Sequence, residues 1–123
     1  QMAEIVRLAG DSIDLISGDD NLTLPILAIG GKGVISVVAN IVPGDTADMI
    51  RSWEKGDIDQ AKKLFYKLLP LCKAMFYETN PVPVKTSLAL MGRIKEELRL
   101  PLAPMAQSNV EMLKKALKDY GLI

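Results

Sequence analysis

The spacing of apolar residues in the first quarter of the chain predicts a helix, a short strand and a second helix. Residues 2–9 carry apolar side chains at helical spacing, and Gly10 follows as a helix stop signal. The next apolar segment predicts a strand at residues 14–17. A second helix is expected over residues 22–29, which are apolar on nearly all sides. Its N-terminal cap is expected from one of three consecutive polar residues, Asp19, Asp20 or Asn21.

Residues 34–39 read VISVVA, and the lack of polar alternation predicts a strand that is covered on both faces. Purely parallel sheets bury their strands in this way. A strand–helix–strand order also requires parallel pairing, so residues 14–17 and 34–39 are expected to lie side by side. Two strands alone would leave unpaired edges. The pattern therefore predicts that the chain is a piece of a larger α/β fold.

Four helices are expected after the second strand. The first spans about residues 46–55, and the next runs from Asp57 to about residue 76 with a kink at Pro70. Shorter helices are expected over residues 83–91 and 107–120, where apolar residues again recur at helical spacing. Trp53 and Cys72 lie on the apolar faces of their helices and are expected in the core.

Composition and charge exclude several classes of function. The chain has 15 Lys and Arg and 15 Asp and Glu, so its net charge of zero argues against nucleic acid and anionic membranes as partners. The sequence contains no histidine, and its six methionines are scattered, so no metal site is expected. The single cysteine forms no intrachain disulfide, which is typical of a reducing compartment and predicts a cytoplasmic location.

Three motifs, in order, give the sequence a family resemblance. They are LISGDDNLTLPILAIGGKGVISVVANIVP at residues 15–43, ETNPVPVK at 78–85 and LRLPLAP at 98–104. Together they resemble the dihydrodipicolinate synthase family, within the pyruvate-dependent aldolase and lyase superfamily. The resemblance implies an α/β fold, a (β/α)8 TIM barrel followed by a helical region. A barrel of this kind needs about 250 residues, so the chain is expected to be its C-terminal part.

On this resemblance the chain has two parts. Residues 1–56 would hold the last βα units of the barrel, namely the end of helix six, strands seven and eight, and helices seven and eight. Residues 57–123 would form the C-terminal helical region. The outer helices around strands six to eight contribute to a subunit contact in the family, so the complete protein is expected to be a homo-oligomer, a tetramer. The apolar helix at residues 22–29 agrees with such a contact.

The resemblance implies a synthase that condenses pyruvate with aspartate semialdehyde through a lysine Schiff base, in lysine and diaminopimelate biosynthesis. No metal or organic cofactor is expected, because the protonated imine withdraws the electrons. The Schiff-base lysine lies on strand six in the family, outside this sequence, so the chain alone is expected to be inactive. The alternatives are part of an N-acetylneuraminate or sugar-acid aldolase, or a non-enzymatic helical interaction module.

The lysines that are present support the same expectation. A lysine nucleophile must be neutral, which requires an apolar pocket or a nearby cation. Lys32 precedes its strand, and most of the other lysines lie on helix faces expected in solvent. Lys85 lies near the start of a helix. None is expected to attack a carbonyl, and no catalytic residue is assigned within the chain.

Four residues are candidates for the ligand site. Gly18 follows the first strand and would let the backbone approach a ligand. The side chain of Ile35 is expected in the core, whereas the resemblance implies that its backbone faces bound pyruvate and the Schiff-base lysine. Asp19 and Asn80 are candidates for a more distant supporting role. A turn or helix cap is the competing interpretation for Asp19, and a rigid corner between helices is the competing one for Asn80.

Overall fold

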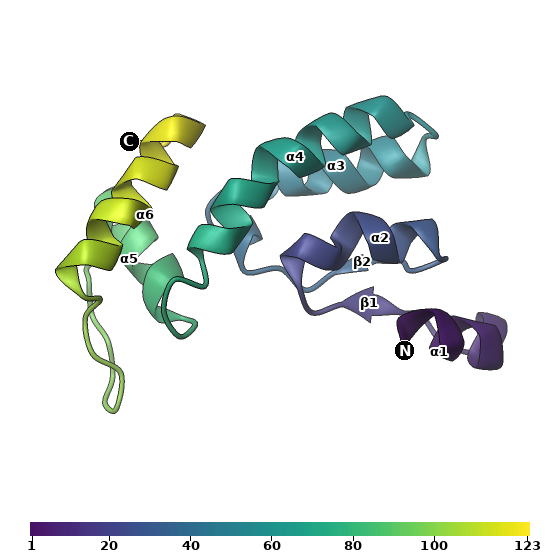
Figure 1. Ribbon diagram of the computed structural model, residues 1–123, viewed down its shortest axis with the longest axis horizontal. Coiled ribbons are helices and arrows are strands. Elements are labelled where there is room, and N and C mark those ends of the chain that lie inside the picture. The colour runs from purple at the N-terminus through teal and green to yellow at the C-terminus, as the bar shows by residue number, and fades with distance from the viewer.

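The computed structural model describes residues 1–123 as an elongated arrangement of helices around one short pair of strands (Figure 1). Helix α1 lies at one end, and α5 and α6 lie at the other. The helices are α1 (Met2–Ala9), α2 (Thr23–Ala28), α3 (Pro43–Glu54), α4 (Ile58–Ala74), α5 (Val82–Leu90) and α6 (Gln107–Tyr120). The strands are β1 (Ile16–Ser17) and β2 (Gly33–Val34), and short 3-10 helices are η1 (Gly10–Ser12), η2 (Asp20–Leu22) and η3 (Val38–Asn40).

The two strands pair in parallel, as predicted, with α2 in the connection between them. Ile16 is opposite Gly33, and Ser17 is opposite Val34. Strand β1 is shorter than the predicted residues 14–17. The parallel pair connected through a helix is consistent with part of a larger barrel.

The predicted strand at residues 34–39 is wrong beyond its first residue. The Ile35 N–H still donates to the Ser17 carbonyl at 2.8 Å. The next backbone donors turn away from the sheet, because the N–H groups of Val37 and Val38 both donate to the Asp20 carboxylate. The chain then forms η3, in which Val38 is only 1% exposed. The apolar run is therefore only partly buried, and it ends in a helical turn at Val38 and Ala39.

Helix α3 begins three residues before the predicted start, at Pro43. Proline suits the first turn of a helix, where its missing N–H would have no intrahelical partner. The Thr46 hydroxyl donates to the Val42 carbonyl at 2.9 Å. The most buried large residue of α3 is Met49, at 2% exposure, whereas Trp53 is only half-buried. The prediction of Trp53 in the core was wrong, because Trp53 is neither one of the buried core residues nor packed against them.

Helices α3 and α4 lie side by side (Figure 1), and α6 contacts α4. Helix α4 continues through Pro70 and ends two residues before the predicted end. The predicted helices 83–91 and 107–120 agree closely with α5 and α6. Gly121 ends α6 in the left-handed conformation at φ 87°, which glycine adopts without a Cβ clash.

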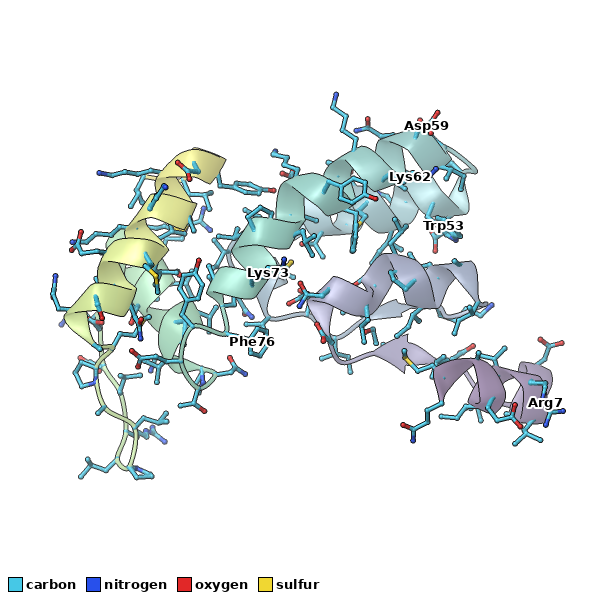
Figure 2. The ribbon with its side chains drawn as sticks, viewed as in Figure 1. Arg7, Trp53, Asp59, Lys62, Lys73 and Phe76 are labelled. Carbon is cyan, nitrogen blue, oxygen red and sulfur yellow. The ribbon has the colours of Figure 1, made fainter.

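One apolar core joins these helices. It contains fifteen buried residues, and Cys72 is among them, as predicted: Val38, Ile41, Val42, Met49, Leu64, Leu68, Leu71, Cys72, Ala74, Met75, Val82, Val84, Met105, Leu113 and Leu117. Charged side chains occupy the outer surface, as Figure 2 shows for Asp59 and Lys62 on α4 and for Arg7 on α1. None of the helices is both long enough and apolar enough to cross a membrane.

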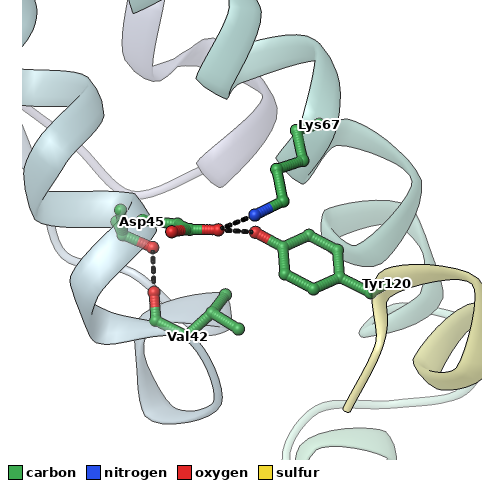
Figure 3. Close-up of polar contacts among 5 residues, drawn as sticks. Val42, Asp45, Lys67 and Tyr120 are labelled. Carbon is green, nitrogen blue, oxygen red and sulfur yellow. Dashed lines mark hydrogen bonds and ion pairs between the residues drawn. The ribbon is translucent and has the colours of Figure 1, made fainter.

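A polar network fastens α6 to α3 and α4 (Figure 3). The Asp45 Oδ2 atom accepts hydrogen bonds from Lys67 Nζ and from Tyr120 Oη, each at 2.5 Å. The Lys67 ammonium also lies 4.7 Å from the centre of the Tyr120 ring. Lys67 and, to a smaller extent, Tyr120 hold the pKa of Asp45 below its ordinary value. Burial, followed by the Asp45 carboxylate, raises the pKa of Tyr120.

Candidate functional site

The carboxyl ends of β1 and β2 form the candidate site, because ligand-binding loops of parallel α/β folds gather there. Gly18 leaves β1 and Ile35 leaves β2 at this edge. The hydrogen bond from Ile35 N to Ser17 O brings the two segments together. The structure therefore places two of the sequence-predicted residues, Gly18 and Ile35, at the same edge.

Gly18 and Ile35 both face solvent. A methyl group built on Gly18 would meet no atom within 4 Å, so the space beside this residue is open. The Ile35 side chain is 77% exposed. Its predicted burial is not observed in this chain, because the two-stranded sheet supplies no further strand or layer that could cover the side chain. The edge thus offers backbone groups in open space to a ligand.

Asp19 supports its own turn. Its carboxylate accepts the Asn21 N–H at 2.9 Å and caps η2. The Ser17 hydroxyl, which is nearly fully buried, donates to the Asp19 carbonyl at 2.7 Å and accepts the Asp19 N–H at 3.0 Å. The capping role predicted as the alternative is the one observed.

Asp20 differs from its neighbour because its side chain is buried, at 5% exposure. Its Oδ2 atom accepts the N–H of Val37 at 3.0 Å and that of Val38 at 3.1 Å. It therefore links the loop after β1 to the segment after β2. The Ser36 hydroxyl completes this turn by accepting the Ala39 N–H at 2.9 Å.

Asn80 lies in the turn between α4 and α5. Its side chain is exposed and makes no hydrogen bond, and a cis peptide bond joins it to Pro81. The nearby Glu78 carboxylate instead fastens this turn to α6, through the Ala106 N–H and the Asn109 amide. No hydrogen bond links Asn80 to Gly18, Asp19 or Ile35.

No lysine of the chain has the surroundings of a carbonyl nucleophile. All are exposed except Lys85 and Lys114, which are half-buried. Lys85 donates to the Glu97 carbonyl, and Lys114 pairs with Glu111 at 2.9 Å. Neither is enclosed in an apolar pocket that would favour a neutral amine. The site residues can therefore line a ligand pocket, but they supply no amine nucleophile.

Cys72 is similarly unsuited to nucleophilic chemistry. Burial, together with the negative charge of Asp20, raises the pKa of its thiol to about 12. Its side chain is 3% exposed within the core. No group of three or more Cys, Asp or Glu side chains is arranged to hold a metal ion.

A cavity lies elsewhere, between α4 and α6. Its volume is about 640 Å³, and its walls include Tyr66, Pro70, Tyr77 and Met112. None of the sequence-predicted site residues lines it. This cavity is therefore separate from the candidate site at the strand ends.

The sequence did not reveal that the Asp20 side chain binds the segment after β2. Asp20 was predicted as one of three possible caps for the following helix, whereas it binds backbone groups 17 and 18 residues later. The buried hydroxyl of Ser17 was also missed. The only sequence signal for this role was the pair of adjacent acidic residues, Asp19 and Asp20. The structure buries Asp20 and leaves Asp19 exposed.

The sequence matches the Dihydrodipicolinate synthetase family over residues 1–120. The chain belongs to this family. It is 60% identical over 123 residues to the 4-hydroxy-tetrahydrodipicolinate synthase of Thermodesulfovibrio yellowstonii, covering 100% of this chain and 42% of that relative. The chain therefore spans less than half the length of this curated relative.

Solved structures of the family have the same arrangement. The dihydrodipicolinate synthase from Aquifex aeolicus is 45% identical, with a TM-score of 0.94 over 98% of this chain and 41% of that chain. The chloride-inhibited dihydrodipicolinate synthase from Acinetobacter baumannii complexed with pyruvate is 37% identical, with a TM-score of 0.94 over 99% of this chain and 42% of that chain. The resemblance that the three motifs predicted is confirmed.

Proposed function

We propose that this chain is the C-terminal part of a 4-hydroxy-tetrahydrodipicolinate synthase, which condenses pyruvate with aspartate semialdehyde in lysine and diaminopimelate biosynthesis. The observation that carries the proposal is the 60% identity, over the whole chain, to a protein of that name. The names of the relatives favour this synthase over an N-acetylneuraminate or sugar-acid aldolase.

The proposed division of the chain follows the observed order of elements. Residues 1–56 would be the end of helix six (α1), strand seven (β1), helix seven (α2), strand eight (β2) and helix eight (α3). Residues 57–123, with α4, α5 and α6, would form the C-terminal helical region. The parallel pairing of β1 with β2 supports this assignment, because adjacent barrel strands pair in parallel.

The chemistry would begin on a lysine in the part of the barrel that this sequence does not contain. Its neutral amine would attack the pyruvate carbonyl, and loss of water would give an imine. Loss of a methyl proton would give an enamine, whose carbon would attack the aldehyde of aspartate semialdehyde. The protonated imine accepts the electron pair, so the reaction needs no metal or organic cofactor. The surroundings of the lysines of this chain support a nucleophile elsewhere.

This chain would contribute the wall of the pyruvate pocket. Gly18 and the backbone of Ile35 would lie beside pyruvate, with Asp19 and Asn80 further away. The position of both residues at the carboxyl ends of the paired strands β1 and β2 supports this role. A pyruvate complex is known for the Acinetobacter baumannii relative.

The complete protein would be a homotetramer. The support is a pair of apolar side chains that flank α2: Leu22, at the end of η2, is 37% exposed, and Ile29, directly after α2, is half-buried. Exposed apolar side chains of this kind are typical of a contact between subunits.

A chimera tests the proposal directly. Residues 1–123 would replace the matched 42% of the Thermodesulfovibrio yellowstonii synthase, and we call this protein the completed chimera. Borohydride reduction with pyruvate should give one covalent adduct by intact mass, on a lysine of the relative's portion. The 123-residue chain alone should give none. The completed chimera should also consume aspartate semialdehyde.

Two results would reject this function. A completed chimera that folds but forms no pyruvate adduct would exclude the Schiff-base reaction. A chimera that forms the adduct but turns over N-acetylmannosamine instead of aspartate semialdehyde would favour the sugar-acid aldolase.

A further inference from the structure

The buried carboxylate of Asp20 is a connection between the two loops of the candidate site. One oxygen, Oδ2, accepts two backbone hydrogen bonds, from Val37 at 3.0 Å and from Val38 at 3.1 Å. Both donors begin or immediately precede η3, where the first N–H groups of a helical turn have no partner within the turn. Asp20 therefore caps a segment that belongs to the next strand.

These two backbone N–H groups stabilise the buried carboxylate of Asp20. A buried carboxylate is costly unless hydrogen bonds replace its lost water. No lysine or arginine forms an ion pair with Asp20, whereas five other acidic residues of the chain have such partners: Glu4, Asp45, Asp48, Asp59 and Glu111. The backbone N–H groups therefore supply the compensation, in charge-assisted bonds that are stronger than neutral ones.

The same loop holds the segment at a second point. The Ser17 carbonyl accepts the Ile35 N–H at 2.8 Å, two residues before the first amide that Asp20 binds. The backbone between these anchors belongs to Ile35 and Ser36. Both anchors come from residues 17–20, so the position of the Ile35 backbone is set by the loop after β1.

We propose that Asp20 is a positioning residue for the pyruvate site, where its carboxylate fixes the Ile35–Ser36 backbone against the loop that begins at Gly18. This inference rests on the proposed function, which places that backbone beside pyruvate. Asp20 touches no substrate in this role and acts through the two amides. Asp19 provides a matched control, because it is exposed and caps only its own turn.

The test uses Asp20→Asn, Asp20→Ala and Asp19→Asn in the completed chimera. A displacement of about 1 Å in a site can cost roughly 100-fold in rate. We expect Asp20→Ala to lower kcat/KM for pyruvate by about 10- to 100-fold, mainly through KM. Asp20→Asn keeps an acceptor oxygen but loses the charge, so it should rescue most of this loss and remain about threefold or more below the unmodified chimera.

Amide hydrogen exchange provides a second readout. Exchange at Val37 and Val38 should be faster in both Asp20 variants, and it should be unchanged in Asp19→Asn. The KM for aspartate semialdehyde should also stay unchanged, because the fixed backbone would face pyruvate. A purely structural role would lower the melting temperature without moving the KM for pyruvate.

The outcomes separate this inference from the proposed function. If the unmodified chimera forms the pyruvate adduct and folded Asp20→Asn has the same KM for pyruvate and the same exchange rates, the role of Asp20 is overturned alone. If Asp20→Ala does not fold, the comparison of Asp20→Asn with Asp19→Asn decides. If the unmodified chimera forms no adduct, the proposed function fails, and this inference fails with it.

Discussion

The hydroxyl of Tyr120 provides a sharp test of how the C-terminal helix is fastened. Tyr120→Phe keeps the ring and removes only the hydrogen bond to Asp45 (Figure 3). Hydrogen bonds to charged groups contribute about 1.5–3 kcal/mol. Because the Asp45 side chain is 29% exposed and keeps its bond to Lys67, we expect the lower end, about 1.5 kcal/mol.

Tyr66→Phe is the control, because Tyr66 is 66% exposed and its hydroxyl makes no hydrogen bond within the chain. Surface changes of this kind usually stay within about 0.5 kcal/mol. The assay is urea unfolding of the completed chimera at pH 7, with the free-energy difference taken from the shift in midpoint at an unchanged slope. Equal midpoints for the two variants would refute the reasoning.

The pH dependence of stability provides a second test of the hydrogen bond between Tyr120 and Asp45. The folded-state pKa of Asp45 is lowered by Lys67 first and then by Tyr120, so its contribution to stability is present above the unfolded value of about 3.9. That contribution is lost as the pH falls through the lowered folded-state pKa. The difference between Tyr120→Phe and the unmodified chimera should therefore shrink below about pH 4. A difference that grows in acid would contradict this account.

Two further predictions concern packing and reactivity. A Cβ at Gly31 would lie 2.1 Å from Ile26 Cγ2 and 2.8 Å from the Ile26 carbonyl oxygen, so Gly31→Ala should destabilise the chimera by about 1–3 kcal/mol in urea unfolding. Gly44→Ala, in the open first turn of α3, should instead stabilise it by about 0.5–1 kcal/mol, and equal effects would refute the packing argument. Cys72, buried with a raised pKa, should resist iodoacetamide at pH 8 until urea unfolds the protein; rapid alkylation of the folded protein, followed by mass spectrometry, would contradict its burial.

The helices were predictable because their signals are local. The apolar spacing of residues 2–9 and 107–120, each followed by a glycine, gave elements within one residue of α1 and α6. The parallel pairing of β1 with β2 was also predictable, since a helix between two strands leaves little alternative. The start of α3 was predicted three residues late, although proline at the first position of a helix is a start signal.

The strand at residues 34–39 could not be corrected from local sequence. The valines of this run favour a strand, but a carboxylate from residue 20 takes the N–H groups of Val37 and Val38. A competitor 17 residues away leaves no mark on the local pattern. The exposure of Ile35 has a different cause, because the two-stranded sheet offers no further layer to cover its side chain.

The candidate site was predictable only by position. The sequence indicated that Gly18 and Ile35 follow strands, and the parallel pairing brings them to one edge. It could not indicate which of two adjacent aspartates is buried, because Asp19 and Asp20 have the same chemistry and differ only in the turn geometry that η2 imposes. The supporting role of Asn80 stays a prediction.

A crystal structure of the completed chimera, trapped with pyruvate and borohydride, would test the central claim most directly. The account predicts a reduced adduct on a lysine outside residues 1–123, with Gly18 and the Ile35 backbone within about 4 Å of the pyruvate atoms. It also predicts that Asp20 still binds the amides of Val37 and Val38. An adduct on a lysine of this chain, or one bound away from the carboxyl ends of β1 and β2, would contradict the account.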